Sequence, residues 1–459
     1  MGVYDGLMVS VSGVRGRVGE ALTPEVIARF AAGFGVWAKG QEGGARRTIV
    51  VGRDSRVSGA MFHRATLAAL QSVGCDVVDV GMAPTPTIQL AVEHHRAAGG
   101  LAITASHNPI EWNALKFIGP SGLFLDGAES SAMRQVVDAA VIPRANWDRL
   151  GGVTADTAAV ARHIDLILAL PFLQVERIRE RAFHVALDCV RGAGATIMPA
   201  LLDRLGCRLS AIHLDMDGHF PRAPEPVAEN LGDLERLVRT SGADVGFAVD
   251  PDVDRLALVS DAGRAIGEDW TLALAARLVL RYRHGPVVVN LSTSRIIEDV
   301  AGEAGAAVVR APVGEVNVAA RMRSENAAIG GEGNGGVILA ELHLGRDAPV
   351  GAAIMLQMMM EDGVPISAVV ARYPRYTIVK EKLDRPNVPL DDVYGALRRV
   401  FPEASADTQD GLRLAWPDRW VHVRPSGTEP IVRVIAEGPS EADARLLVSR
   451  SRAPLDALR

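Results

Sequence analysis

The stretch RTIVVGRDSRVSGAMFHRATLAALQSVGCDVVDVG, residues 47–81, decides the fold class. It begins with a short apolar run that predicts a buried strand, and a polar turn leads from that run into a predicted helix. Gly74 ends this helix, because glycine readily adopts the left-handed conformation just past a helix end. A second apolar run predicts another strand. Strands that alternate with helices indicate mixed or parallel sheets with helical cover.

The same unit recurs twice further along the chain. One copy runs over residues 184–215 and the other over residues 285–314, and each has a glycine, Gly206 or Gly305, after its predicted helix. The three copies lie too far apart to be the repeats of a small-period solenoid. We therefore predict three related α/β domains with mixed sheets.

The C-terminal part of the chain follows a different pattern. A strand is predicted over residues 376–386, and DGLRLAWPDRWVHV favours a hairpin that turns at Pro417-Asp418. Helices are predicted near residues 390–400 and 441–451, so this part reads as a separate α+β domain. We predict four domains with the active site in their central cleft, where ligand sites are common, and place them at residues 1–148, 149–255, 256–370 and 371–459.

The overall composition disfavours several classes of protein. The chain has 49 basic and 55 acidic residues and a net charge of −6, whereas nucleic-acid binders usually carry a basic excess. No N-terminal signal segment and no apolar run of about 18 residues is present, which predicts a cytoplasmic protein without membrane contact. Three scattered cysteines without a C-x-x-C pair suggest neither a disulfide framework nor a zinc site.

The loop TASHNP, residues 104–109, is the first candidate for chemistry. Ser106 stands beside His107, and Lys116 follows ten residues after the serine. The hydrolase pattern G-x-S-x-G is absent, so a serine nucleophile here needs activation by a base, a metal or prior phosphorylation. The alternative is an ordinary turn in which the serine and asparagine cap backbone groups.

The loop DPDVDR carries Asp250, Asp252 and Asp254 at alternate positions between two apolar runs. Three adjacent carboxylates repel one another unless a cation joins them, and hard oxygen ligands suit Mg²⁺. An EF-hand is excluded, because its sixth position needs glycine and is occupied by Arg255. Arg255 directly after the aspartates suggests that the ligand is itself an anion. The alternative is a solvated acidic turn.

Two further loops suggest the recognition of a sugar and of a phosphate. The glycine-rich stretch IGGEGNGGVI does not fit the dinucleotide fingerprint, and Glu332 and Asn334 within it can accept hydrogen bonds from hydroxyl groups. The stretch VRPSGTEPIVRV lacks the Walker pattern. It offers guanidinium, hydroxyl and amide donors suited to a phosphate, in Arg424, Ser426, Gly427, Thr428 and Arg433.

The ordered set of these motifs resembles the α-D-phosphohexomutase family along essentially the whole chain. The motifs that carry the resemblance are SGVRG, GRDSR, TPT, TASHNP, DGHFPRAPEPVAENL, DPDVDR, GGEGNGG and RPSGTEP, in that order. Each motif alone is only moderately specific, whereas the ordered set is very specific.

The resemblance implies an enzyme that carries Ser106 as phosphoserine and interconverts hexose 6-phosphate and hexose 1-phosphate through a bound 1,6-bisphosphate. Ser106 and the three aspartates are then expected to hold Mg²⁺. Lys116 and His107 are the candidates for proton transfer, and Arg15 is expected to hold the charge of the phosphoserine. A hexose 1,6-bisphosphate is the expected activator, a phosphosugar is the expected partner, and the protein is expected to be a monomer or homodimer.

The resemblance also bears on the choice of sugar. RPSGTEP and SHNPIEWNALKF look most like phosphoglucosamine mutases, and the acidic Glu315 resembles that type because bifunctional mannose and glucose enzymes tend to carry histidine there. Asn334 and Gly336 depart from the serine and histidine that the family often has in this loop. Glucosamine 6-phosphate is therefore the favoured substrate. The mannose and glucose phosphates, and a relative that binds phosphosugars without catalysis, stay open as alternatives.

Overall fold

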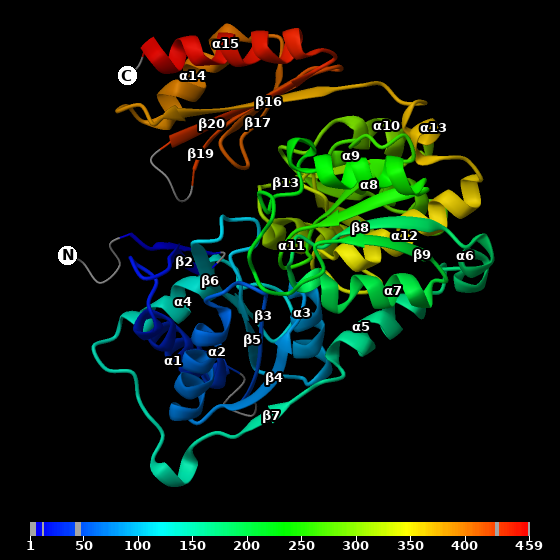
Figure 1. The fold of residues 1–459 in the computed structure, drawn as a ribbon. Helices are drawn as coiled ribbons and strands as arrows, with labels where there is room; N and C mark the ends of the chain where they lie inside the picture. The colour runs from blue at the N-terminus through cyan, green and yellow to red at the C-terminus, as the bar shows by residue number, and fades with distance from the viewer. Residues whose placement is uncertain (1–5, 12, 42–46, 427–430, 458–459) are drawn as a thin grey trace. The chain divides into compact units, whose positions relative to one another are not determined.

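The computed structural model describes residues 6–11, 13–41, 47–426 and 431–457 of the chain, and Figure 1 labels its helices and strands. The chain divides into two compact units, each of which is described by itself. The first unit comprises residues 1–271 and 335–367, and the second comprises residues 272–334 and 368–459.

The first unit contains a seven-stranded sheet in the order β1-β2-β6-β5-β3-β4-β7. Its strands are β1 (Met8–Ser10), β2 (Gly13–Arg17), β3 (Thr48–Arg53), β4 (Asp76–Met82), β5 (Gly99–Ile103), β6 (Trp112–Ile118) and β7 (Val153–Ala155). Strands β3, β4, β5 and β7 pair in parallel, whereas β6 pairs antiparallel with both β5 and β2. The sheet is therefore mixed, as the alternating pattern predicts.

Helices cover both faces of this sheet, namely α1 (Pro24–Gly40), α2 (Gly59–Ser72), α3 (Thr85–His94) and α4 (Gly127–Asp138). Two neighbouring glycines of β5 show which helix lies on which face. A Cβ added at Gly99 would meet Phe34 of α1 at 2.8 Å, and a Cβ added at Gly100 would meet Val92 of α3 at 2.5 Å. Successive residues of a strand point to opposite faces, so α1 and α3 cover opposite sides.

The first unit also contains a four-stranded sheet in the order β11-β10-β8-β9. Its strands are β8 (His184–Asp188), β9 (Arg208–Ile212), β10 (Val245–Val249) and β11 (Leu256–Ser260). Strand β8 pairs in parallel with β9 and β10, and β11 runs antiparallel to β10. The other α-helices and strands that lie wholly within this unit are α5 (Ala159–Leu168), α6 (Val175–Arg181), α7 (Met198–Arg204), α8 (Gly232–Ser241), β15 (Gly336–Leu339) and α12 (Ala348–Asp362).

The second unit contains the three parallel strands β13 (Val308–Ala311), β12 (Val287–Asn290) and β14 (Ile329–Glu332), paired in that order. Helices α10 (Ile296–Glu303) and α11 (Glu315–Glu325) connect them. The chain passes between the units at three points. Helices α9 (Asp269–Val279) and α13 (Ile366–Val370) span two of them, and the third lies between Asn334 and Gly335.

The second unit also holds a five-stranded antiparallel sheet in the order β16-β20-β19-β18-β17. Its strands are β16 (Thr377–Asp384), β17 (Ser405–Asp407), β18 (Leu412–Ala415), β19 (Trp420–Pro425) and β20 (Ile431–Gly438). Figure 1 shows α14 (Leu390–Val400) and α15 (Glu441–Ala457) together beside this sheet, with which they share one hydrophobic core.

The three predicted strand–helix–strand units are confirmed. They form the parallel pairs β3–β4, β8–β9 and β12–β13. Gly74, Gly206 and Gly305, which follow the connecting helices, have φ values of +76°, +72° and +64°. The C-terminal hairpin is also confirmed, because Ala415 pairs with Trp420 across the predicted turn. The four-domain boundaries stay predictions.

Among the described residues, no helix combines the length and the apolar character that are needed to cross a membrane.

Candidate active site

The loop that carries Ser106 follows β5 directly and has an uncommon backbone conformation. Ser106 has a φ of +48°, a region that few residues other than glycine adopt. Its amide nitrogen donates to Oγ1 of Thr104 at 2.9 Å, and its hydroxyl donates to Oδ2 of Asp250 at 2.8 Å. The structure thus brings the predicted nucleophile to the first aspartate of the predicted metal loop.

A buried arginine, Arg56, holds this loop in place. Its guanidinium donates to four backbone oxygens at 2.6–2.8 Å, those of Ser106, Asn108, Pro109 and Trp112. Its Nε donates to Asp54, which also accepts from the hydroxyl of Thr104. Only a planar group with five donors can satisfy so many acceptors at once. Arg56 was missed as a functional residue, although the motif GRDSR contains it.

Arg56→Met is expected to lower the free energy of unfolding of the first unit by about 3–5 kcal/mol, because it leaves the carboxylate of Asp54 buried without its partner. Thermal melts followed by circular dichroism measure the loss. Arg64→Met, which removes an exposed arginine from α2, is the matched control and should leave the melt nearly unchanged. Equal melting temperatures for the two variants would contradict the role of Arg56.

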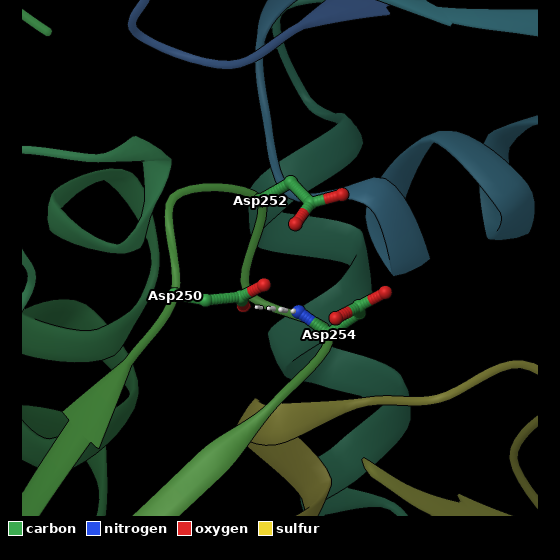
Figure 2. A group of neighbouring side chains, drawn as sticks. All are labelled: Asp250, Asp252 and Asp254. Atoms are coloured by element: carbon green, nitrogen blue, oxygen red, sulfur yellow. Dashed lines mark hydrogen bonds between the residues drawn. The ribbon is translucent and has the colours of Figure 1, made fainter. Parts of the chain in front are cut away.

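Asp250, Asp252 and Asp254 form a buried cluster in the loop between β10 and β11 (Figure 2). Each offers one carboxylate oxygen, and these three oxygens lie within 4.8 Å of one another. The carboxylates are held by different donors. Asp250 accepts from the backbone of Asp254 and Arg255 at 3.2 Å, the first of which Figure 2 marks with a dashed line.

Cationic side chains hold the other two carboxylates. Oδ2 of Asp252 accepts from Nζ of Lys116 and from the hydroxyl of Thr85, both at 2.8 Å. Oδ2 of Asp254 accepts from Arg346 at 2.6 Å. Neither residue was predicted as a partner of the triad, although Thr85 lies in the motif TPT; Arg346 lies in none of the motifs.

The unpaired atoms of this cluster fit a divalent cation. Within the described part of the chain, Oδ1 of Asp252 and Oδ1 of Asp254 are buried and accept no hydrogen bond. Burial and the two neighbouring carboxylates raise the pKa of Asp250 well above its ordinary value. Burial also opposes ionisation of Asp252, but the charge of Lys116 and the hydrogen bonds with Asp250, Lys116 and Thr85 together outweigh it and lower the pKa of Asp252. Unpaired hard oxygens and mutually repelling charges are what Mg²⁺ satisfies.

The other predicted residues of the first unit surround the serine. Nη1 of Arg15 donates to the side chain of Asn108 at 3.0 Å. Nδ1 of His107 lies 3.4 Å from the hydroxyl of Ser106. Burial and the charges of Arg255 and Arg15 lower the pKa of His107 well below its ordinary value. His107 is therefore neutral near pH 7 and able to accept a proton.

Glu225, within the motif DGHFPRAPEPVAENL, is a residue whose role the sequence analysis did not recognise. Its Oε1 accepts from Nη1 of Arg255 at 3.1 Å and lies 3.9 Å from Nε2 of His107. Arg255 is buried, and its Nε has no hydrogen-bond acceptor among the described residues. An anion is the natural acceptor for this nitrogen.

In the second unit, two of the predicted sugar-binding residues, Glu315 and Glu332, lie near the start of α11. Oε1 of the buried Glu332 accepts from the amide of Gly314 at 3.1 Å and from Asn290 at 2.8 Å. Glu315, the next residue after Gly314, is the first residue of α11 and is buried. Asn334 lies in the turn directly after β14 and is partly buried. The structure therefore brings the carboxylate of Glu332 to the backbone of Gly314, the residue before Glu315.

The predicted phosphate-binding residues lie on the hairpin of β19 and β20. Arg424 pairs directly opposite Arg433 in this antiparallel ladder, and like charges in such positions repel each other. Nε of Arg424 lies 3.0 Å from Oδ2 of Asp410, which also accepts from the amide of Val313. The amide of Ser426 donates to the carbonyl of Ile431. The predicted residues Gly427 and Thr428 lie outside the described residues.

Comparison with known proteins identifies the family. Sequence profiles of the phosphoglucomutase/phosphomannomutase alpha/beta/alpha domains I, II and III match residues 7–141, 161–263 and 267–376, and that of the C-terminal domain matches residues 382–452.

Individual relatives cover nearly the whole chain. A protein of Methanopyrus kandleri named probable phosphoglucosamine mutase is 39% identical over 97% of this chain and 96% of its own. A protein of Thermococcus kodakarensis named phosphoglucomutase/phosphomannomutase is 39% identical over 96% of both chains. The crystal structure of a phosphoglucomutase/phosphomannomutase family protein from Burkholderia thailandensis has a TM-score of 0.85, 27% identity and 98% coverage of both chains. This chain therefore belongs to the phosphoglucomutase/phosphomannomutase family and is a phosphohexomutase.

Proposed function

We propose that this enzyme converts glucosamine 6-phosphate to glucosamine 1-phosphate through a phosphoserine at Ser106. The observation that carries the proposal is the contact between the hydroxyl of Ser106 and Asp250, whose neighbours Asp252 and Asp254 each keep one carboxylate oxygen that accepts no hydrogen bond. A phosphoryl group on this serine would lie beside a cation-binding loop. Phosphoryl transfer depends more on such placement and charge neutralisation than on covalent help from the protein.

The proposed reaction has two balanced transfers. In the first, the anomeric hydroxyl of the sugar attacks the phosphorus of phosphoserine and a protein base takes the hydroxyl proton, while the bond between phosphorus and Oγ of Ser106 breaks and a protein acid gives Oγ a proton. In the second, Oγ of Ser106 loses its proton to a protein base and attacks the other phosphate of the bound 1,6-bisphosphate, and the sugar oxygen leaves and takes a proton from a protein acid. Added hexose 1,6-bisphosphate acts as activator because it can phosphorylate an unmodified Ser106.

Residues near the serine supply the proton transfers and the charge. His107 lies close to Oγ of Ser106, and its neutral ring can accept a proton there. The Nζ of Lys116 is held by Asp252 within the same loop cluster and suits an acid. Arg15 holds the charge of the phosphoserine. Bound Mg²⁺ would neutralise charge on the transferred phosphoryl group.

The second unit supplies recognition in this proposal. Arg424 and Arg433, whose charges repel each other across the hairpin, bind the phosphate that is not being transferred. Glu332, Glu315 and Asn334 bind the sugar, and the carboxylates of the two glutamates favour the ammonium group of glucosamine. The name of the Methanopyrus kandleri relative supports glucosamine, whereas that of the Thermococcus kodakarensis relative favours the second candidate, glucose and mannose phosphates.

Phosphorus NMR of the purified enzyme with Mg²⁺ and a trace of hexose 1,6-bisphosphate tests the substrate. Glucosamine-, glucose- and mannose-6-phosphate are supplied in parallel samples. An anomeric phosphate signal that grows with glucosamine 6-phosphate is the expected result. Growth with glucose or mannose phosphate alone would transfer the proposal to the second candidate.

Arg424→Ala is expected to raise KM for the phosphosugar more than about ten-fold, because a charge-assisted hydrogen bond contributes about 1.5–3 kcal/mol. Steady-state kinetics measures the change. Arg419→Ala is the matched control, since Arg419 lies in the turn of a neighbouring hairpin and pairs with Asp418. An unchanged KM in the first variant would move the phosphate site elsewhere.

A further inference from the structure

A buried network of two histidines, one aspartate and one threonine lies behind the aspartate triad. Thr87, His163, His343 and Asp347 are each at most 4% exposed. The hydroxyl of Thr87 lies 2.8 Å from Nδ1 of His163, and Nε2 of His163 lies 2.8 Å from Oδ2 of Asp347. Nε2 of His343 lies 3.0 Å from the same oxygen of Asp347. The reaction proposed above uses none of these four residues.

The hydrogen bonds determine which atoms of the network carry protons. The amide of Gly345 donates to Nδ1 of His343, so this nitrogen carries no proton and His343 is the neutral tautomer with its proton on Nε2. His343 therefore donates to Asp347. Burial opposes ionisation of Asp347, but the contacts with His163 and His343 outweigh it and lower the pKa of Asp347. The carboxylate is thus ionised and accepts from both rings, while its Oδ1 accepts from the amide of Val350.

One end of the network adjoins Asp254. Arg346, the residue before Asp347, donates to the carboxylate of Asp254 at 2.6 Å. Ala348, the residue after Asp347, donates its amide to the carbonyl of Val253 at 3.2 Å. Fixing the side chain of Asp347 therefore fixes both contacts that its chain neighbours make with the loop of the triad.

The other end adjoins Asp252. Thr87 and Thr85 belong to the first turn of α3, and Thr85 donates its amide and its hydroxyl to the backbone and side chain of Asp252 at 2.9 and 2.8 Å. His163 joins this turn to Asp347. The network thus connects the two segments that contact the triad loop from the sides of Asp252 and Asp254.

Backbone strain in the triad loop shows that outside contacts determine its shape. Val253 has a φ of +65° and is fully buried. A β-branched residue in this region is a conformational outlier, and such strain persists only where the surroundings over-determine the backbone. The hydrogen bond from Ala348 to the carbonyl of Val253 is one of these determining contacts.

We propose that Thr87, His163, His343 and Asp347 are positioning residues that hold the aspartate triad in its cation-binding geometry. The inference rests on the proposed Mg²⁺ site but not on the identity of the sugar. Residues behind the direct ligands commonly change metal affinity by about 10–100-fold when they are mutated. The network therefore acts on cation affinity without touching the cation or the substrate.

Asp347→Asn is the sharpest test, because neither orientation of the introduced amide can satisfy every neighbour. When the nitrogen of the introduced amide points toward the histidines, it faces the Nε2 proton of His343. That proton cannot move to Nδ1, because Nδ1 already accepts a hydrogen bond from the amide of Gly345. When the nitrogen of the introduced amide is reversed, it faces the amide of Val350. Mn²⁺ alone, with the free ion counted by electron paramagnetic resonance, measures cation affinity without turnover. The dissociation constant is expected to rise about ten-fold or more.

Variants of His163 separate positioning from a general loss of stability. His163→Leu removes both contacts and should weaken Mn²⁺ binding, whereas His163→Gln can still donate to Asp347 and should recover much of the affinity. His184→Gln is the matched control, because His184 is also buried and hydrogen-bonded to Ser210 but has no described contact with the triad loop. This control should lower the melting temperature while leaving Mn²⁺ affinity unchanged.

Three results would overturn the inference. Wild-type Mn²⁺ affinity in folded Asp347→Asn would exclude positioning by the network. Should that variant fail to fold, Thr87→Val removes one hydroxyl at nearly constant volume, and unchanged affinity in it would exclude positioning as well. If the Asp254→Asn variant bound Mn²⁺ as tightly as the wild type, the triad would not be the cation site, and the network would have no cation site to hold in place. None of these measurements depends on the sugar, so the inference would hold even if the enzyme acted on another sugar phosphate.

Discussion

Ser106→Ala is expected to reduce mutase turnover by about 10⁴-fold or more, the scale seen when a covalent nucleophile is removed. The physical reason is that Oγ of Ser106 is the hydroxyl oxygen that contacts Asp250, and alanine has no oxygen to take its place. Without Oγ there is no group to carry the phosphoryl between the two ends of the sugar. Turnover is measured by the growth of the anomeric phosphate signal in phosphorus NMR.

A second serine provides the control for this result. Ser55 is also buried in the first unit and donates its hydroxyl to the carbonyl of Arg191 at 2.7 Å. Ser55→Ala removes a comparable hydrogen bond and should retain turnover of the same order as the wild type. Mass spectrometry of the intact proteins should also show a phosphate on the Ser55→Ala variant and none on the Ser106→Ala variant. Turnover near the wild-type rate in Ser106→Ala would eliminate the phosphoserine mechanism.

Asp252→Asn is expected to lower turnover by about 10²-fold or more and to raise the Mg²⁺ concentration required for half-maximal activity. Oδ2 of Asp252 accepts from Lys116 and Thr85, and Oδ1 is the buried unpaired oxygen. An amide placed there must turn its nitrogen either toward these two donors or toward the cation. In the first orientation the amide nitrogen faces two other donors, and in the second its partial positive charge faces the cation. In either case the negative charge that balances Lys116 is lost.

A titration of activity against Mg²⁺ measures this effect. Asp156→Asn is the control, because Asp156 also pairs with a histidine and an arginine, His95 and Arg162, but lies outside the triad. The control should keep the wild-type Mg²⁺ dependence. If the Asp252→Asn titration superimposes on that of the control, the triad does not bind the cation that the reaction needs.

Much of the fold and part of the site could be predicted because they depend on local physics. The repeated strand–helix–strand units follow from the periods of apolar residues, and the glycines after the helices from their freedom to adopt positive φ. The hairpin at Pro417-Asp418 follows from its turn residues. The three aspartates could be recognised as a candidate metal site because one short loop holds them all.

The partners of these residues could not be predicted, because they lie far away along the chain. Asp250 meets Ser106 across 144 residues, and Asp252 meets Lys116 across 136. Arg346 contacts Asp254, which lies 92 residues away in the sequence, and no sequence pattern near Arg346 predicts that contact. Glu225 lies within the motif DGHFPRAPEPVAENL, yet its position beside Arg255 and His107 depends on how separate elements pack.

The sequence by itself determined which segments become strands and helices, which loops carry chemistry, and which family the ordered motifs resemble. The tertiary structure alone decided that Arg56 holds the serine loop, that two carboxylate oxygens of the triad stay unpaired, and that a buried network stands behind Asp252 and Asp254. The reason is physical. Backbone periodicity acts over a few residues, whereas a buried polar contact exists only once sheet order and helix packing bring its two partners together.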